Sequence, residues 1–342
     1  MIGVRILCVL WMVTQLAVGQ EGHLQWSEDR SGFNLKTTTP ASLEFRFTLS
    51  GMHLEYMEAG DTGFNRIIIE GFTYDSKIGD PELPVYQQLI ELPGDGRSVI
   101  KIVSRERRHI DLNQQGFQAP LFPAQPPVLK KNKEQDPPMR MNRGIYSKDT
   151  LLENTAIRII PLGTMRGKKI GLLSISPVAY NPRKNTLEIL TRLDGRIEFS
   201  VPGQQAMEDP YESPSFDAIF KSLLNQSLKS VGSSRPEKLV ILADTMFRAA
   251  LKPFVAWKTL KGFEVIEVYK GENGVGTTAV EMRDYLAEMY HSATEEDPAF
   301  TYLLLVGDHD QIPAFQPSHV SDLYYAEYDG NGDFLPDVLY GR

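Results

Sequence analysis

The residues best suited to chemistry are the carboxylates of a short acidic run near the end of the chain. Asp329, Asp333 and Asp337 lie in the sequence Asp-Gly-Asn-Gly-Asp-Phe-Leu-Pro-Asp, where glycines permit a tight turn. Oxygen ligands placed along such a loop suit a calcium ion. Because clustered carboxylates without basic neighbours need neutralising, we predict a cation site here. A hairpin turn is the alternative, since Asp-Gly and Asn-Gly pairs favour that as well.

A second polar group follows the apolar run Tyr302–Val306. If that run is a parallel strand, Asp308 and His309 lie at its carboxyl end, where open α/β sheets form ligand sites. Asp308 and Asp322 are therefore candidates for completing the cation site. The alternatives are an ordinary polar loop after the strand and a solvated side chain for His309.

Other catalytic signatures are absent from the sequence. The six histidines show no HExxH or other zinc spacing, and there is no Gly-x-Ser-x-Gly elbow. The turn Ala243–Met246 lacks the glycines that let a backbone approach a pyrophosphate. With 36 Lys and Arg against 44 Asp and Glu, the net charge of −8 argues against a basic face for nucleic acid.

The N-terminus has the pattern of a secretory signal peptide. Residues 1–19 place Arg5 before an apolar run and end in Ala-Val-Gly, which has small residues at the cleavage positions. The run is shorter than the ~20 residues that a spanning helix needs, and no later segment is long and apolar enough to cross a membrane. We therefore expect a secreted, extracellular or cell-surface protein. Since Cys8 is the only cysteine, the mature chain would have no disulfide, thiolate zinc site or cysteine nucleophile.

The first of two patterns that position these residues covers about residues 45 to 201. Apolar and polar residues alternate there in short runs such as Leu187–Leu193, and a turn is expected at Asp194-Gly195. Alternation with period two buries one face of an antiparallel sheet, so a β-sandwich-like domain is predicted. The proline-rich run 120–138 is predicted to be an extended surface loop, and Gly232–Pro236 a linker.

The second pattern begins near residue 236. Leu239–Leu242, Phe263–Val268 and Tyr302–Val306 are apolar runs typical of buried parallel strands, with amphipathic helical spacing between them. This βαβαβ order predicts an open parallel sheet with right-handed crossovers. The predicted fold class is an α+β two-domain chain, a β-sandwich-like part followed by the beginning of an α/β parallel-sheet domain. Because Val338–Tyr340 looks like a strand just begun, we expect a piece of a larger domain.

Motifs in both halves resemble a known family. In the second half they are Leu239–Leu242, Pro253-Phe254, Trp257-Lys258, Lys261-Gly262, Tyr302–Asp308, Ile312-Pro313, Ser321-Asp322, Tyr324-Tyr325 and Gly341-Arg342. Together these resemble the start of the catalytic domain of the gingipain-type cysteine peptidases. Residues 45–201 are similar to the family's β-rich propeptide, most clearly at Gly79–Pro84 and Ile90–Pro93.

The resemblance implies a secreted caspase-like α/β cysteine endopeptidase that is made as a zymogen. Residues 1–19 would be the signal peptide and residues 20–235 a β-rich propeptide with its linker, which inhibits the enzyme and assists folding. Residues 236–342 would be the N-terminal part of the catalytic domain. The expected partners are polypeptide substrates of the full-length protein and an intramolecular contact between propeptide and catalytic domain, with no nucleic acid and no membrane span. Arg235 or Lys229 would be the processing position.

The resemblance also assigns roles to single residues. It implies calcium ligands at Asp308, Asp333, the carbonyl of Leu335 and Asp337. Asp329 is added to them, although this sequence is one residue longer than the family between Ser321-Asp322 and Gly341-Arg342. The family's catalytic His, in a Gly-His-Gly stretch, and its catalytic Cys would follow Arg342, so no catalytic residue is expected here. The alternative is a non-enzymatic secreted calcium-binding or surface-assembly module with the same fold.

Overall fold

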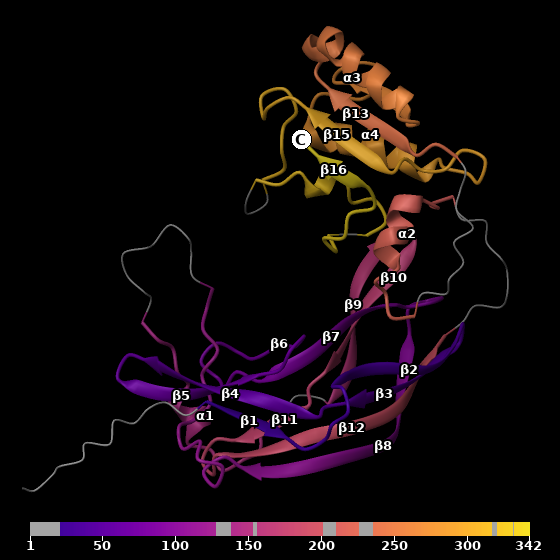
Figure 1. Ribbon diagram of the computed structural model, residues 1–342. Coiled ribbons are helices and arrows are strands. Elements are labelled where there is room, and N and C mark those ends of the chain that lie inside the picture. The colour runs from indigo at the N-terminus through magenta and orange to yellow at the C-terminus, as the bar shows by residue number, and fades with distance from the viewer. Residues whose placement is uncertain are drawn as a thin grey trace, which may run out of the picture.

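The computed structural model describes residues 21–127, 138–152, 156–200, 210–225, 235–316, 320–330 and 332–342. Residues up to 200 form an elongated β body and residues from 235 form a smaller α/β body (Figure 1). Residues 210–225, which we call the bridging segment, lie between the two. The predicted signal peptide with Cys8 lies outside the described residues, as does Lys229.

Antiparallel strands in three sheets make up the β body. The first sheet has the order β1 (Gly22–Gln25), β4 (Gly51–Ala59), β5 (Thr62–Ile68). The second has the order β6 (Thr73–Tyr74), β7 (Pro84–Glu91), β10 (Lys168–Ile175), β9 (Ile157–Met165). The third has the order β11 (Val178–Asn181), β12 (Thr186–Phe199), β3 (Ser42–Thr48), β2 (Gly32–Thr39), and β8 (Ser98–Asp111) also pairs with β12. One short helix, α1 (Arg143–Tyr146), accompanies them.

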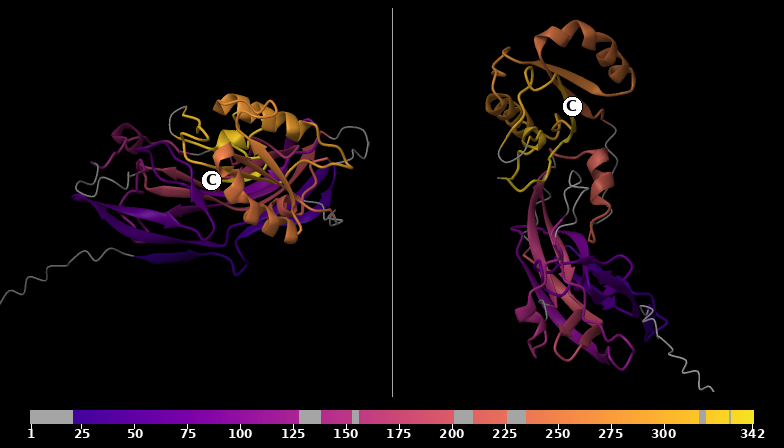
Figure 2. Two further views of the ribbon diagram at one scale, coloured as in Figure 1. Left: turned by 90° about the horizontal axis from the view of Figure 1, so that it is seen from above. Right: turned by 90° about the vertical axis from the view of Figure 1, so that its left-hand side faces the viewer.

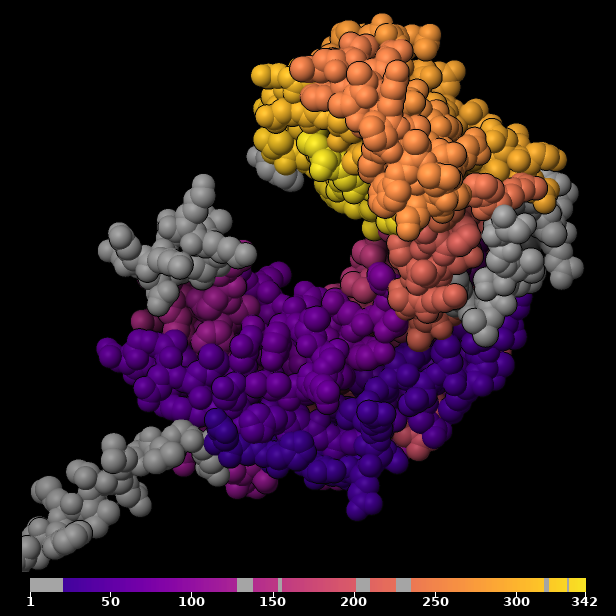
Figure 3. Space-filling model, turned by 45° about the horizontal axis from the view of Figure 1, so that its top comes forward, coloured from indigo at the N-terminus to yellow at the C-terminus, as the bar shows by residue number. Residues whose placement is uncertain are grey.

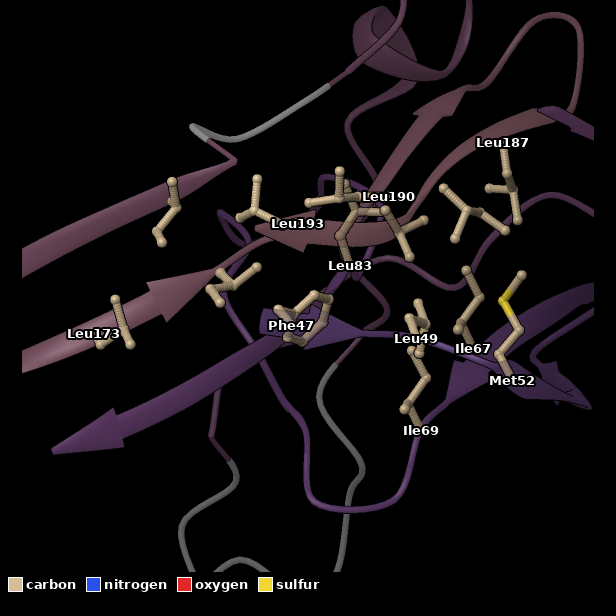
Figure 4. Packing of buried hydrophobic residues seen from close by; sticks show 14 of the residues in the cluster. Phe47, Leu49, Met52, Ile67, Ile69, Leu83, Leu173, Leu187, Leu190 and Leu193 are labelled. Atoms are coloured by element: carbon tan, nitrogen blue, oxygen red, sulfur yellow. The ribbon is translucent and has the colours of Figure 1, made fainter. Parts of the chain in front are cut away.

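The core of the β body follows from the alternation of its strands. In β3, Leu43, Phe45 and Phe47 are fully buried, whereas the residues between them face outward. Figure 4 shows Phe47 and the residues around it pointing toward Leu190 and Leu193 of β12. The apolar faces of different sheets thus share one core, as the period-two pattern predicts.

One predicted turn is wrong. Asp194-Gly195 was expected to separate two strands, but β12 continues through it from Thr186 to Phe199 with only a shift of register against β8. Asp194 is buried and accepts hydrogen bonds from Lys36 at 2.6 Å and from Arg46 at 2.9 Å. A Cβ on Gly195 would lie 2.6 Å from the ring of Phe45, so glycine serves here for a close approach between strands.

The α/β body contains a four-stranded parallel sheet. Its strands are β13 (Lys238–Ala243), β14 (Glu264–Tyr269), β15 (Tyr302–Val306) and β16 (Leu339–Gly341), in the order β14-β13-β15-β16. Its helices are α3 (Arg248–Leu260) and α4 (Ala279–His291), with short 3₁₀ turns η1 (Thr245–Phe247) and η2 (Leu323–Tyr325). The predicted α+β class and βαβαβ order are confirmed.

The two helices cover opposite faces of this sheet. Leu239 and Ile241 pack with Leu251 of α3, whereas Val240 and Leu242 pack with Met282 and other residues of α4. Successive residues of a strand point to opposite faces, so β13 is apolar throughout and buried on both sides.

The bridging segment carries one helix, α2 (Pro214–Phe220), whose N-cap is Ser213. Phe216 and Phe220 are buried among residues from both bodies, including Ile170 of β10 and Leu339 of β16. The junction is narrow when seen from the side (Figure 2), and the α/β body overhangs the rest of the β body in the space-filling view (Figure 3). Within the described part of the chain, no helix has the length and apolar character needed to span a bilayer.

Candidate functional site

The point where the two bodies meet is the tip of the β9–β10 hairpin. Met165 of β9 pairs with Lys168 of β10, and the two residues between them, Arg166 and Gly167, have positive φ angles of 48° and 74°. Two successive residues of this kind form the tight turn that fits the twist of a hairpin. The hairpin reaches out of the β body toward the α/β body (Figure 1). We call residues 164–167 the hairpin tip.

Arg166 is the buried cation of this contact, with 1% of its surface exposed. Its guanidinium donates to four backbone carbonyls: Nε to Tyr211 at 2.7 Å, Nη1 to Phe300 at 2.9 Å and Asp337 at 3.1 Å, and Nη2 to Ala299 at 3.2 Å. A buried charge is tolerated when its hydrogen-bonding capacity is used in this way. The planar fork of arginine can reach several carbonyls at once, which a lysine cannot.

Two aromatic rings lie against the same guanidinium. The ring centre of Phe216 in α2 is 4.9 Å from it and that of Tyr290 in α4 is 5.9 Å away. Cations are attracted to the faces of such rings, and more strongly where water is excluded. Arg166 therefore joins the β body to the bridging segment and to the α/β body at one point.

The backbone of the hairpin tip binds the acidic segment, by which we mean residues 328–330 and 332–337. Each of the three predicted carboxylates accepts one N–H from the tip: Asp333 Oδ2 from Thr164 at 2.7 Å, Asp337 Oδ1 from Arg166 at 2.8 Å, and Asp329 Oδ2 from Gly167 at 2.6 Å. The close approach needs small residues, because a Cβ on Gly163 would lie 2.2 Å from the carboxylate of Asp333. The hairpin and the acidic segment are complementary in shape and charge.

Asp337 is the centre of the acidic segment and is fully buried. Its second oxygen accepts the backbone N–H groups of Tyr328 at 2.6 Å and Asp329 at 2.9 Å. Burial, with a contribution from the charge of Asp329, raises the pKa of Asp337 to about 7, although these N–H donors act in the opposite direction. Desolvation of the carboxyl group thus outweighs the N–H donors that favour its charged form.

The structure brings Asp329, Asp333 and Asp337 together but leaves Asp308 elsewhere. Asp308 follows the carboxyl end of β15, whereas Asp337 precedes the amino end of β16, and Tyr302 pairs with Leu339 in register. The five residues of β15 alone separate those levels by roughly 15 Å, at about 3.3 Å per residue. Leu335 lies in the acidic segment, and its N–H donates to Asp333 Oδ1 at 3.0 Å.

The donor set has the right chemistry for calcium, but most of its carboxylate oxygens accept backbone N–H groups in this arrangement. The oxygens of Asp333 and Asp337 and one oxygen of Asp329 face N–H donors. Among the described residues, no group of three or more His, Cys, Asp or Glu side chains is placed to hold a metal ion. The calcium ligand set therefore stays a prediction, and one that needs a rearranged acidic segment.

The carboxyl edge of the sheet, where Asp308 lies, is organised by Arg342. Its guanidinium forms a two-pronged ion pair with Asp322 at 2.6 and 2.8 Å and donates to the carbonyls of Gly307 and Ile312. Asp322 is thus an ion-pair partner in this structure. His309 is exposed and its Nδ1 accepts the N–H of Ala314 at 3.2 Å, in agreement with a loop histidine.

Sequence reasoning missed Arg166. An Arg-Gly pair between alternating strands has the composition of an ordinary surface turn, and nothing local distinguishes it. The partners of its side chain lie 45 to 171 residues away along the chain. The role of Arg166 can be recognised only from its tertiary contacts.

Comparisons with known proteins agree with this two-part organisation. Peptidase family C25 matches residues 233–342, and the C25 propeptide family matches residues 35–212. A Lys-gingipain of Porphyromonas gingivalis is 29% identical over 301 residues, which is 85% of this chain and 17% of that protein. Gingipain R2 of the same species is 25% identical over 205 residues, which is 58% of this chain and 27% of that protein. The chain thus spans about a sixth of the Lys-gingipain it matches.

A solved structure supports the fold. It is described as giving insight into the zymogenic latency of gingipain K from Porphyromonas gingivalis. It is 23% identical to this chain, with a TM-score of 0.50, and the match covers 54% of this chain and 100% of that one.

Proposed function

Since the chain belongs to peptidase family C25, with a gingipain-like propeptide followed by the start of a C25 peptidase domain, we propose that it acts within a secreted cysteine endopeptidase zymogen. In this zymogen the propeptide assists folding of the peptidase domain and keeps it inactive. The substrates of the full-length protein are polypeptides. The active peptidase is released when the propeptide is removed.

The observation that carries this proposal is the contact between the two parts. The hairpin tip of the propeptide is buried against the acidic segment and the amino edge of the peptidase sheet. A propeptide that acts on its own peptidase domain requires a specific contact of this kind. The alternative function, a surface-assembly module, does not require a contact with a buried arginine between its two parts.

The proposal assigns no catalytic residue to this chain. Its only cysteine is Cys8, within the predicted signal peptide, so the thiolate nucleophile and its activating base would come from sequence beyond Arg342. The described residues would hold the propeptide and the start of the peptidase domain together. Catalysis would belong to the rest of the protein.

Secretion and calcium are further parts of the proposal. The charged start, short apolar run and small residues of positions 1–19 support export. Calcium would be held by oxygens of the acidic segment only after the hairpin amides have left them. There the ion would neutralise the carboxylates and fix the loop.

Reading the coding sequence beyond Arg342 separates the two functional alternatives. The proposal expects a Gly-His-Gly stretch followed by a cysteine in the same reading frame. An in-frame stop directly after Arg342 would leave only the non-enzymatic alternative.

A further inference from the structure

We infer that the hairpin tip is the anchor that retains the propeptide on the peptidase domain, and that it does so at the sheet edge opposite the carboxyl edge. The inference rests on the proposed function, because it names the contact by which the proposed propeptide is held. It adds that the part of the propeptide that holds it on the peptidase domain differs from any part that blocks the carboxyl edge of the sheet.

Arg166 recognises the starts of two strands of the parallel sheet. Ala299 and Phe300 lie just before β15, and Asp337 lies just before β16, so three of the four carbonyls bound by the guanidinium belong to the amino edge of the sheet. Carbonyls at this position have no further strand to pair with, and buried carbonyls need donors. The arginine supplies donors to both strand entries at once.

The backbone amides of the hairpin tip match the carboxylates of the acidic segment one to one. Thr164, Arg166 and Gly167 each donate a backbone N–H to a different aspartate of the acidic segment. In an isolated hairpin, N–H groups at the tip that do not pair across the strands face water. Here each has a carboxyl oxygen as its acceptor, at the short distances of 2.6 to 2.8 Å.

An apolar collar of residues from three segments lies beside these polar contacts. Phe216, Phe220 and Leu223 of the bridging segment are buried with Ile170, and Leu335 and Leu339 of the α/β body pack against them. Exclusion of water by such a collar strengthens the polar contacts that it surrounds. The anchor therefore has the composition of an interface core, with an arginine at its centre.

The position of the anchor separates two roles. Ligand sites of open α/β sheets form at the carboxyl ends of the strands, and here that edge carries Gly307 and Asp308. The hairpin tip lies at the other end of β15 and does not cover that edge. While the chain is intact, the two parts are also joined covalently through residues 226–234. After a cut there, retention would depend on the noncovalent contact alone.

Hydrogen exchange of the 342-residue chain tests the anchor directly. The N–H groups of Thr164, Arg166 and Gly167 are expected to exchange about a hundredfold or more slowly than those of an exposed hairpin turn, because they are bonded inside a buried contact. Arg166→Ala should accelerate their exchange at least about tenfold, and Arg166→Lys nearly as much, since the ammonium cannot reach four carbonyls. Arg105→Ala, which removes an exposed arginine of β8, is the matched control and should change nothing at the tip.

A steric variant keeps the test independent of charge. Gly163→Ala places a methyl group where the Asp333 carboxylate lies, so it should release the same three amides while the amides of Phe45 and Phe47 in the β-body core stay protected. The inference is overturned if the tip amides of the unmodified chain exchange at the rate of an open turn. It is equally overturned if Arg166→Ala and Gly163→Ala leave their protection unchanged.

A retention assay on the full-length protein distinguishes this inference from the proposed function. After a cut introduced within residues 226–234, the propeptide should co-purify with the peptidase domain, and Arg166→Ala should increase its loss at least about tenfold. If activity is latent before the cut but Arg166→Ala does not affect retention, the anchor is wrong and the zymogen proposal stands. If the anchor is confirmed but the uncut protein is fully active, the zymogen proposal fails and the contact is structural.

Discussion

At the scale of single residues, the chain places charges in its interior and satisfies them with several partners each. Arg166 is bound by four carbonyls, and Asp194 by Lys36, Arg46 and Arg192. Removal of one partner of a buried charge is strongly destabilising, because the other charge is left without compensation. Such residues are therefore the sharpest sites for testing the structure.

Asp194 predicts a specific dependence of stability on pH. Burial opposes ionisation, but hydrogen bonds from Lys36, Arg46 and Arg192 outweigh it and hold the pKa of Asp194 well below its ordinary value. A carboxylate whose pKa is depressed by folding stabilises the protein above its unfolded pKa of about 3.9, and this stabilisation is lost as the pH falls toward the folded pKa. Asp194→Asn should lower the free energy of unfolding of the β body by about 2 kcal/mol at pH 7.

Urea unfolding of the β body at pH 7 and at lower pH checks this. The difference between the unmodified chain and Asp194→Asn should shrink steadily below about pH 4. Glu198→Gln is the control, since its pair with Lys101 is exposed and should contribute less than about 0.5 kcal/mol. A difference that is independent of pH would show that Asp194 is not the ionised centre of this cluster.

The acidic segment makes a second prediction at this scale, that calcium and the hairpin tip compete. Because N–H donors face the oxygens of Asp333 and Asp337, the unmodified chain should bind calcium weakly in isothermal titration. Arg166→Ala should bind it at least about tenfold more tightly, since the hairpin would no longer hold Asp333 Oδ2 and Asp337 Oδ1. The double variant Arg166→Ala, Asp333→Asn should lose the gain. Equal affinity of the unmodified chain and Arg166→Ala would contradict competition.

At the scale of elements, the helices of the α/β body depend on local signals that the sequence displays. Helix α4 begins with a capping box, in which Thr278 accepts the N–H of Glu281 and the Glu281 side chain accepts the N–H of Thr278. The helix then places Met282, Leu286 and Tyr290 in the core beneath the sheet.

Thr278→Ala should destabilise the α/β body by about 1 kcal/mol, because the first-turn N–H groups of α4 lose their cap. Thermal unfolding monitored by circular dichroism measures the change. Thr259→Ala in the last turn of α3 is the matched control, since that hydroxyl bonds only the Val255 carbonyl within its own helix. If both variants unfold alike, the capping box is not a determinant of this helix.

The same scale shows how far sequence reasoning reaches. Alternation and continuous apolar runs predicted the β body and the βαβαβ order, because both patterns are local consequences of which faces are buried. The turn at Asp194-Gly195 was wrong, because three cations from β2, β3 and β12 hold Asp194 inside a continuous strand. The acidic residues were correctly predicted to lie together. Their partners, however, are backbone N–H groups of the hairpin tip, about 165 residues earlier in the chain, and no local sequence pattern indicates that contact.

At the scale of the whole molecule, two bodies meet at one narrow junction (Figure 2). The bridging segment and the hairpin tip both contribute to it, and the hairpin places the buried guanidinium of Arg166 at the amino edge of the peptidase sheet. A body held at one edge leaves the other edge of the sheet accessible to further parts of the full-length protein.

The most direct test of the central claim is the peptidase activity of the full-length protein before and after its propeptide is removed. A labelled protein substrate should be cleaved slowly by the uncut protein, and rapidly once a cut within residues 226–234 has been followed by separation of the propeptide. Full activity of the uncut protein, or none after the propeptide has been removed from a folded peptidase domain, would contradict the account.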